Sequence, residues 1–191
     1  TLLNNEGTTF LHEKLEHLLS KALDEELIED AIICKNDLER NKLWEIRENA
    51  AENEKKELIN SHAKKCLKHD ISLPINNIEK FHQETQKMIF TKIKNTRTIF
   101  FGHLGDGNLH YNIFGNGKGD DGFENQSQNI TENLYKIIEK LNGSFSAEHG
   151  IGQLKKDNLR FFKDPVAYNL MKNIKYMIDP KNIMNPGKIL I

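Results

Sequence analysis

Apolar and polar residues recur with two different periods along this chain, and each period predicts one kind of element. Helical spacing predicts helices at about residues 10–23, 37–48, 75–93, 123–141 and 165–177, with a short helix that ends at Phe161. Short apolar or alternating runs predict strands at residues 2–3, 30–34, 66–74 and 144–147 and a hairpin within 100–114. The Lys/Glu-rich stretch 51–65 fits either a helix or a loop.

Strands and helices alternate, but the two strands of the hairpin follow each other directly. A purely parallel sheet would need a crossover at every connection. We therefore predict an α+β fold, with a ferredoxin-like, largely antiparallel sheet of about six strands and helices packed on one face. A length of 191 residues fits a single domain that spans residues 1–191.

The hairpin carries the first candidate site. An Asp-Gly pair between apolar segments is the strongest short hairpin signal, and a two-residue turn at Asp106-Gly107 places His103 directly opposite His110. Cross-strand partners hold their Cβ atoms about 4.5–5.5 Å apart, so the two imidazoles can share a divalent metal ion. Asn112 falls on the same face of the sheet. The alternative is two ordinary, half-exposed strand histidines.

A second motif, at residues 146–150, supplies the remaining groups of this candidate site. Glu148 is the natural third ligand, and two histidines with one carboxylate suit Zn²⁺ or a similar ion with an open coordination position. His149 follows directly and is a candidate general base, because a nearby divalent ion lowers the pKa of an imidazole. The alternative for Glu148 and His149 is a helix cap beside a surface histidine.

Two cations are candidates for holding a carboxylate. Arg47 lies on a predicted helix and can grip a carboxylate with two hydrogen bonds, and Lys68 alternates along a predicted strand. The alternatives are a surface arginine paired with Glu48 or Glu52 and a lysine on an edge strand.

Composition narrows the class of protein. A formal net charge of −1 gives no strong field for nucleic acid, and we expect no nucleic-acid partner. Cys34 and Cys66 lack CxxC spacing and are predicted to be reduced, buried thiols of a cytoplasmic protein. No apolar run reaches the length of a membrane span, and no signal peptide is visible.

Five ordered motifs cover nearly the whole chain and are recognisable together. They are LWEIRE at 43–48, KHDISLP at 68–74, GHLGDGNLH at 102–110, SAEHGIG at 146–152 and MNPGKI at 184–189. This set resembles the C-terminal domain of FAD-linked oxidases of the vanillyl-alcohol-oxidase type. The nearest branch looks like the D-lactate, glycolate and D-2-hydroxyglutarate dehydrogenases.

The resemblance implies a role for each candidate. His103, His110 and Glu148 would hold a Zn²⁺-like metal, and His149 would take the proton of the substrate hydroxyl while the α-hydride passes to FAD. Arg47 and Lys68 would hold the carboxylate of a D-2-hydroxy acid, and Asn112 would contact this substrate. Flavin contacts are expected at Asn108, Asn185 and Lys188. The implied function is the substrate- and metal-binding domain of a dehydrogenase that makes a 2-oxo acid.

Two departures from the family pattern matter. The dicarboxylate-specific branch often has a hydroxyl residue one helical turn after the arginine, but Ala51 stands there, which argues against a 2-hydroxyglutarate-like substrate. The N-terminal FAD-binding domain is also absent from the 191 residues, so we expect a separate FAD-binding domain or subunit as a partner. A homodimer and a peripheral place at the inner membrane are further expectations.

Two other functions stay open at this point. The chain could be a non-catalytic metal-binding or interaction remnant that has lost the flavin half. A hydrolytic zinc enzyme would need a carboxylate that activates water, and Asp106 at the hairpin tip is the candidate.

Overall fold

The computed structural model describes residues 8–60, 66–94, 96–115 and 122–190. Contacts divide the chain into two compact units, Thr1–Asn49 and Ala50–Ile191. The single domain over 1–191 therefore stays a prediction. Each unit is described by itself below.

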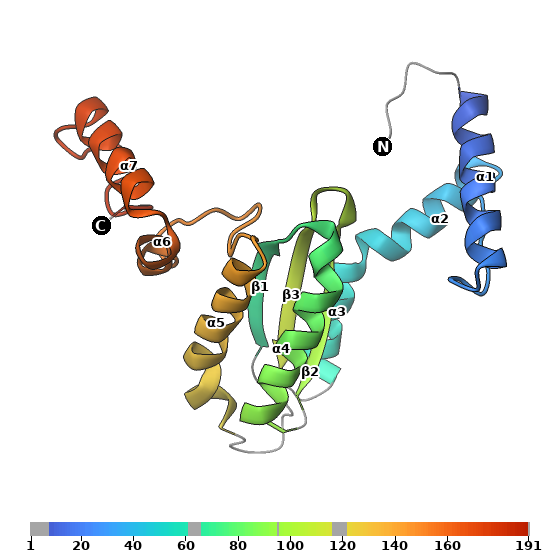
Figure 1. Ribbon diagram of the computed structural model, residues 1–191, viewed down its shortest axis with the longest axis horizontal. Helices are drawn as coiled ribbons and strands as arrows, with labels where there is room; N and C mark the ends of the chain where they lie inside the picture. The colour runs from blue at the N-terminus through green and yellow to red at the C-terminus, as the bar shows by residue number, and fades with distance from the viewer. Residues whose placement is uncertain (1–7, 61–65, 95, 116–121, 191) are drawn as a thin grey trace. The chain divides into compact units, whose positions relative to one another are not determined.

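The N-terminal unit contains two of the predicted helices, α1 (Thr8–Asp24) and α2 (Asp37–Glu48) (Figure 1). The side chain of Asn36 caps α2 by accepting the backbone N–H of Glu39 at 2.9 Å. The predicted strand at 30–34 is wrong, because these residues pair with no other strand in the described part of the chain and Ile32 is 73% exposed. The strand predicted at residues 2–3 lies outside the described residues.

The second unit is built on a three-stranded antiparallel sheet in the order β1-β3-β2. Its strands are β1 (Cys66–Ser72), β2 (Arg97–His103) and β3 (Asn108–Phe114). The helix α4 (Ile78–Lys92), preceded by the 3₁₀ turn η1 (Ile75–Asn77), connects β1 to β2, and α5 (Phe123–Lys140) follows β3. The sequence predicts a strand at residues 144–147, but these residues form a single antiparallel bridge, between Ser144 and Ser72.

This order of elements confirms the α+β fold with a largely antiparallel sheet. The chain runs β-α-β-β-α and returns to the edge of β1, which is the ferredoxin-like arrangement with its last strand reduced to a bridge. About six strands were predicted, and the described residues contain three.

The two faces of the sheet differ in chemistry. One face packs under α4 and α5, where β1 contributes Ile71, β3 contributes Leu109, Tyr111 and Ile113, and all four side chains are buried. Helical spacing turns the apolar stripes of α4 and α5 toward these residues; the stripes consist of Phe81, Ile89, Ile130, Leu134 and Ile138. The opposite face carries the polar residues of the same strands, namely Lys68, Asp70, Asn108, His110 and Asn112.

The hairpin register differs from the prediction by two residues. His103 pairs with Asn108, and His110 pairs with Phe101, so the two histidines are not opposite each other. The turn is longer than two residues: Leu104–Asp106 form a 3₁₀ turn (η2), and only Gly107 has a positive φ, of 69°. Gly107 lies so close to Leu73, the residue after β1, that a Cβ there would lie 1.9 Å from the carbonyl oxygen of Leu73, which only glycine permits.

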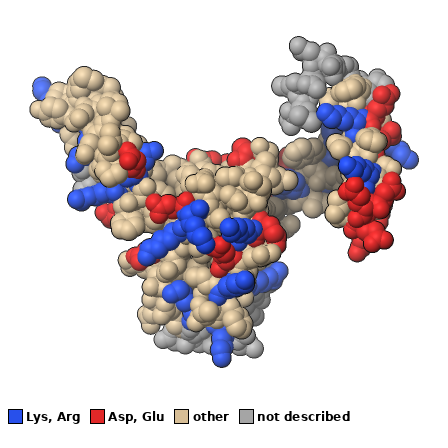
Figure 2. Space-filling view, in the orientation of Figure 1, with Lys and Arg blue, Asp and Glu red and all other residues tan. Residues whose placement is uncertain are grey.

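The remaining helices of this unit are α3 (Ala50–Asn60), α6 (Lys156–Phe162) and α7 (Pro165–Ile178). The stretch 51–65 is therefore helical up to residue 60. Among the described residues, none of the helices combines the length and the hydropathy that a transmembrane segment needs. Cys34 and Cys66 are half-buried free thiols. In the face drawn in Figure 2, Lys and Arg are interspersed with Asp and Glu, as expected of a chain with net charge −1.

Candidate functional site

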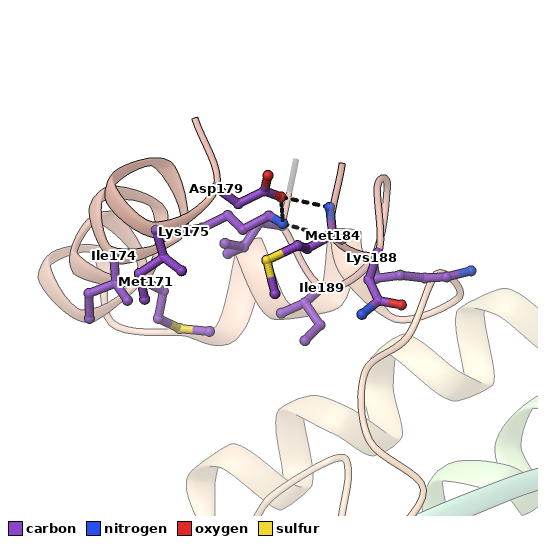
Figure 3. A pocket seen from close by; sticks show the side chains of 10 residues that line it. Met171, Ile174, Lys175, Asp179, Met184, Lys188 and Ile189 are labelled. Carbon is purple, nitrogen blue, oxygen red and sulfur yellow. Dashed lines mark hydrogen bonds and ion pairs between the residues drawn. The ribbon is translucent and has the colours of Figure 1, made fainter. Parts of the chain in front are cut away.

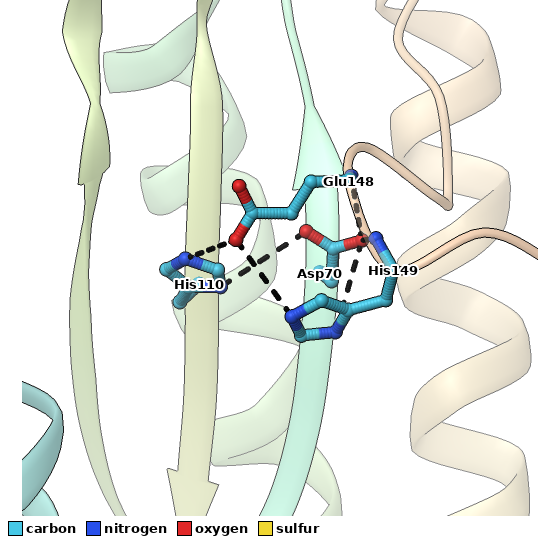
Figure 4. Close-up of side chains that lie close together, drawn as sticks. All are labelled: Asp70, His110, Glu148 and His149. Atoms are coloured by element: carbon cyan, nitrogen blue, oxygen red, sulfur yellow. Dashed lines mark hydrogen bonds and ion pairs between the residues drawn. The ribbon is translucent and has the colours of Figure 1, made fainter.

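A pocket of about 350 Å³ opens on the polar face of the sheet. Four side chains converge there: Asp70 from β1, His110 from β3, and Glu148 and His149 from the loop that follows α5 (Figure 4). Each offers one possible metal-ligating atom, and these atoms lie within 4.8 Å of one another. Residues far apart in the sequence thus form one polar cluster.

Asp70 fixes the loop that carries two of these side chains. Its buried carboxylate accepts, on Oδ2, the backbone N–H groups of Ala147, Glu148 and His149 at 2.9–3.0 Å. Burial alone would raise the pKa of Asp70, but these three backbone donors and the nearby His149 ring lower it below its usual value. The ionised carboxylate therefore holds the loop at the sheet.

His110 lies between two carboxylates. Its Nε2 is 3.1 Å from Oε1 of Glu148, and its Nδ1 is 4.0 Å from Oδ1 of Asp70. The ring of His149 stacks on that of His110 with centroids 5.6 Å apart, and its side chain is 64% exposed. Asn108 donates a hydrogen bond from Nδ2 to Oε2 of Glu148 at 3.1 Å, which fixes the second carboxylate oxygen.

A second group of polar contacts lies along the same pair of strands. Lys68 and Asn112 are directly opposite each other on β1 and β3. The carboxylate of Glu54, from α3, lies 2.6 Å from Nζ of Lys68 and accepts a 2.7 Å hydrogen bond from Nδ2 of Asn112. All three residues line the pocket.

Lys155 completes the wall of the pocket. Its Nζ donates to the carbonyl oxygen of Phe145 at 3.1 Å and to Oγ of Ser146 at 3.3 Å. Burial lowers the pKa of Lys155, and the charge of Asp70 offsets part of this effect. Lys155 therefore holds residues 145–146 of the loop, and Asp70 holds residues 147–149.

The donor set fits a divalent metal ion. Imidazole nitrogen and carboxylate oxygen are ligands of Zn²⁺ and similar ions, and His110 and Glu148 present one of each at 3.1 Å. Oδ1 of Asp70 is buried without a hydrogen-bond partner among the described residues and faces the other nitrogen of His110. A carboxylate on the far nitrogen of a metal-ligating histidine is the usual orienting partner in such sites.

The structure brings together most of the residues predicted from the sequence. His110, Glu148, His149, Lys68 and Asn112 line one pocket, and Asn108 is bonded to Glu148. His103 is exposed and does not belong to the group of four candidate ligands.

Two further predicted positions are carried by α2 and by the hairpin turn. Arg47 is half-buried on α2, in the N-terminal unit. Asp106 is exposed on the hairpin turn, where its Oδ1 accepts the backbone N–H of Asn108 at 3.1 Å.

Asn185 and Lys188 line a different, mostly apolar pocket of about 430 Å³ formed by α7 and the C-terminal tail. Figure 3 shows Lys175 and Asp179 at this pocket beside Met171, Met184 and Ile189. Asp179 accepts hydrogen bonds from Lys175 and from the backbone N–H groups of Ile183 and Met184, which lowers its pKa. These bonds fold the tail back onto α7.

The sequence did not predict Asp70, Glu54 or Lys155 as residues of this pocket. Asp70 alternates with Lys68 along β1, so a correct β1–β3 register would have placed it opposite His110. Glu54 gave no signal, because only the packing of α3 against the sheet brings it to Lys68 and Asn112.

Comparison with known proteins identifies the family of the chain. The family described as FAD linked oxidases, C-terminal domain, matches residues 2–189. A protein named D-2-hydroxyglutarate dehydrogenase from Stutzerimonas stutzeri (strain A1501) is 32% identical over 192 residues, which is 98% of this chain and 39% of the relative.

Two relatives named D-2-hydroxyglutarate dehydrogenase, mitochondrial, show similar agreement. The one from Arabidopsis thaliana is 34% identical over 93% of this chain and 30% of the relative. The one from Danio rerio is 32% identical over 99% of this chain and 34% of the relative. The chain thus spans between three and four tenths of the length of these relatives. With the family match over nearly all its residues, the chain belongs to the C-terminal domain family of FAD-linked oxidases.

Proposed function

We propose that this chain is the substrate- and metal-binding domain of a flavin-dependent dehydrogenase that oxidises a D-2-hydroxy acid to a 2-oxo acid. One observation carries the proposal: a candidate pair of metal ligands, an exposed imidazole and a lysine–amide pair share one pocket on the polar face of the sheet. The family and the names of the relatives support the same class of reaction.

Different residues of the chain bind the substrate and accept its proton. Lys68 and Asn112 donate hydrogen bonds to the substrate. Arg47, on α2, is proposed as a partner of the substrate carboxylate from the resemblance of its sequence motif alone. The exposed ring of His149 accepts the proton of the substrate hydroxyl at a ring nitrogen. Asp70 fixes the backbone that carries this ring, because its carboxylate accepts the backbone N–H of His149 at 2.9 Å.

FAD supplies the acceptor for the hydride and belongs to a separate FAD-binding domain or subunit. The contacts proposed for the flavin on this chain are Asn108, Asn185 and Lys188. Homodimer formation and a cytoplasmic location remain predictions of the sequence.

For the metal, we propose His110 and Glu148 as ligands, with His103 as the third. Nε2 of His110 faces Glu148 and Nδ1 faces Asp70, so the geometry favours Nε2 as the ligating atom and Asp70 as the orienting group. A bound divalent cation polarises a hydroxyl or carboxylate oxygen.

Calorimetric titration of the purified chain with Zn²⁺ tests the metal site. We expect one site in the parent chain, loss of this site in His110→Ala and His103→Ala, and parent-like binding in the control His17→Ala, which removes an exposed histidine of α1. Retention of the site in His103→Ala would show that His103 is not a ligand. Retention in His110→Ala would refute the metal site proposed here.

A second experiment tests the reaction. The chain is coexpressed with the remainder of the Stutzerimonas relative, and reduction of an artificial dye is measured with D- and L-2-hydroxy acids. We expect dye reduction with D-enantiomers that is lost in His149→Ala. Bound flavin without dye reduction by any D-2-hydroxy acid would refute the proposed reaction.

A further inference from the structure

The carboxylate of Glu54 occupies an unusual place in the pocket. Glu54 is 5% exposed, and its two oxygens contact two different polar groups, Nζ of Lys68 at 2.6 Å and Nδ2 of Asn112 at 2.7 Å. Burying a carboxylate is unfavourable unless it is paired and hydrogen-bonded, and this arrangement satisfies both conditions. The folded chain therefore holds the Glu54 carboxylate in place through these two contacts.

These are also contacts that a substrate carboxylate would make. An ammonium group and an amide N–H are donors that recognise a carboxylate, and both are directed here at a carboxylate of the chain itself. Lys68 is 55% exposed and has three N–H donors, so it can still bond a substrate, but Glu54 cancels its positive charge.

The side chains that line the pocket also carry more carboxylates than ammonium groups. Among the residues that line it, three carboxylates (Glu54, Asp70 and Glu148) face two ammonium groups (Lys68 and Lys155). Glu54 therefore makes the sum of these side-chain charges one unit more negative, and the two charges of a bound divalent cation would add to that sum equally with and without Glu54. Unit charges a few ångströms apart interact appreciably at the effective dielectric of a protein surface, so one carboxylate can decide between ligands that differ by one charge.

We propose that Glu54 is a specificity-determining residue that directs this pocket toward monocarboxylic 2-hydroxy acids and against dicarboxylic ones. The proposal rests on the proposed function, since it concerns the substrate of the same site. The relatives are named for D-2-hydroxyglutarate, which carries two carboxylates, so the substrate proposed for this chain differs from the one in their names.

The test compares two ligands of equal length that differ by one carboxylate, D-2-hydroxyglutarate and D-2-hydroxypentanoate. Their dissociation constants are measured by calorimetry on the full chain loaded with Zn²⁺. We expect the parent to bind D-2-hydroxypentanoate more tightly. Glu54→Gln, which keeps the shape and removes the charge, is expected to raise the affinity for D-2-hydroxyglutarate relative to D-2-hydroxypentanoate by about tenfold.

A matched control separates the local effect from a change in net charge. Glu84 of α4 pairs with Lys140 of α5 at 3.1 Å, outside the residues that line the pocket, and Glu84→Gln removes the same charge. We expect the parent's affinity ratio in this variant. Glu54→Met, also uncharged and of similar size, carries the same prediction as Glu54→Gln if the latter fails to fold.

The outcomes separate the two proposals. An affinity ratio that changes less than twofold in the uncharged Glu54 variants, or that changes equally in Glu84→Gln, would overturn the role of Glu54. A parent chain that binds neither ligand would instead overturn the proposed function.

Discussion

The two faces of the central sheet use the same strands for opposite purposes. On β3, Tyr111 and Ile113 are buried under the helices, whereas their neighbours His110 and Asn112 face the pocket. The first face gains free energy by removing apolar surface from water. The second face buries polar groups, which costs less free energy where they have partners, as in the bond between Asn112 and Glu54. Stability and chemistry are therefore separated by one residue along the strand.

The largest loss of stability is expected when a buried side chain of the apolar face is shortened. Ile113→Ala removes a fully buried side chain and should lower the free energy of unfolding by about 2–5 kcal/mol. His110→Ala, on the other face, should cost less, about 1 kcal/mol, because the loss of this polar ring leaves no apolar cavity. Urea denaturation measures both. Equal losses of stability in the two variants would show that the faces do not divide in this way.

Acid should weaken the apolar face through His69, the one histidine of β1. Its buried ring donates from Nδ1 to the carbonyl oxygen of Tyr111 and accepts from Thr131, and burial lowers its pKa from 6.5 to about 4. Between pH 6.5 and about 4 the unfolded chain binds a proton that the folded chain does not, so stability falls as the pH falls through this window.

The loss should approach about 3 kcal/mol at pH 4. Denaturation of the parent and of His69→Gln across this range checks it. The variant retains hydrogen-bonding capacity and should lack this component of the pH dependence. A parent whose stability is flat between pH 6.5 and 4 would contradict the prediction.

Asp70 belongs to the polar face but contributes to stability as well. Asp70→Asn keeps the shape of the side chain and replaces a charged acceptor of three backbone N–H groups by a neutral one, so we expect a loss of about 2 kcal/mol. Zn²⁺ affinity should fall by about 10–100-fold, because the orienting partner of His110 is weakened. Asp24→Asn, an exposed position on α1, is the control for both measurements. Unchanged Zn²⁺ affinity would remove Asp70 from the proposed metal site.

The smallest effect on stability is expected at His149. Its side chain is 64% exposed, so His149→Ala should change the free energy of unfolding by less than about 0.5 kcal/mol. Zn²⁺ binding should persist, whereas dye reduction with the flavin partner should be lost. Thermal unfolding measures the stability of the variant, and calorimetry measures its binding of Zn²⁺. Full dye reduction in this variant would exclude His149 as the proton acceptor.

Much of the fold could be predicted from the sequence because its signals are local. The helical stripes of α4 and α5 and the caps before α2 and α7 depend on residues within a few positions of one another. The strand predicted at 30–34 failed because an apolar run forms a strand only where a partner strand supplies its hydrogen bonds, and no local signal reports that partner.

The hairpin shows the limit of local reasoning. Asp106-Gly107 correctly indicated a reversal, but the docking of Gly107 against Leu73 of the chain beyond β1 selects a longer turn and moves the register by two residues. A shift of two keeps every side chain on its predicted face. His110 and Asn112 therefore share a face as predicted, although His103 is not opposite His110.

The sequence by itself determined which residue types alternate along each strand and which face of each helix is apolar, because backbone geometry imposes those periods on any chain. Only the tertiary structure decided which polar residues meet. Glu54 reaches Lys68, and Asp70 reaches the backbone of residues 147–149, through contacts between segments that are 14 and 77 or more positions apart. Such contacts depend on how helices and loops pack on the sheet, and the free energy of this packing is shared among many residues.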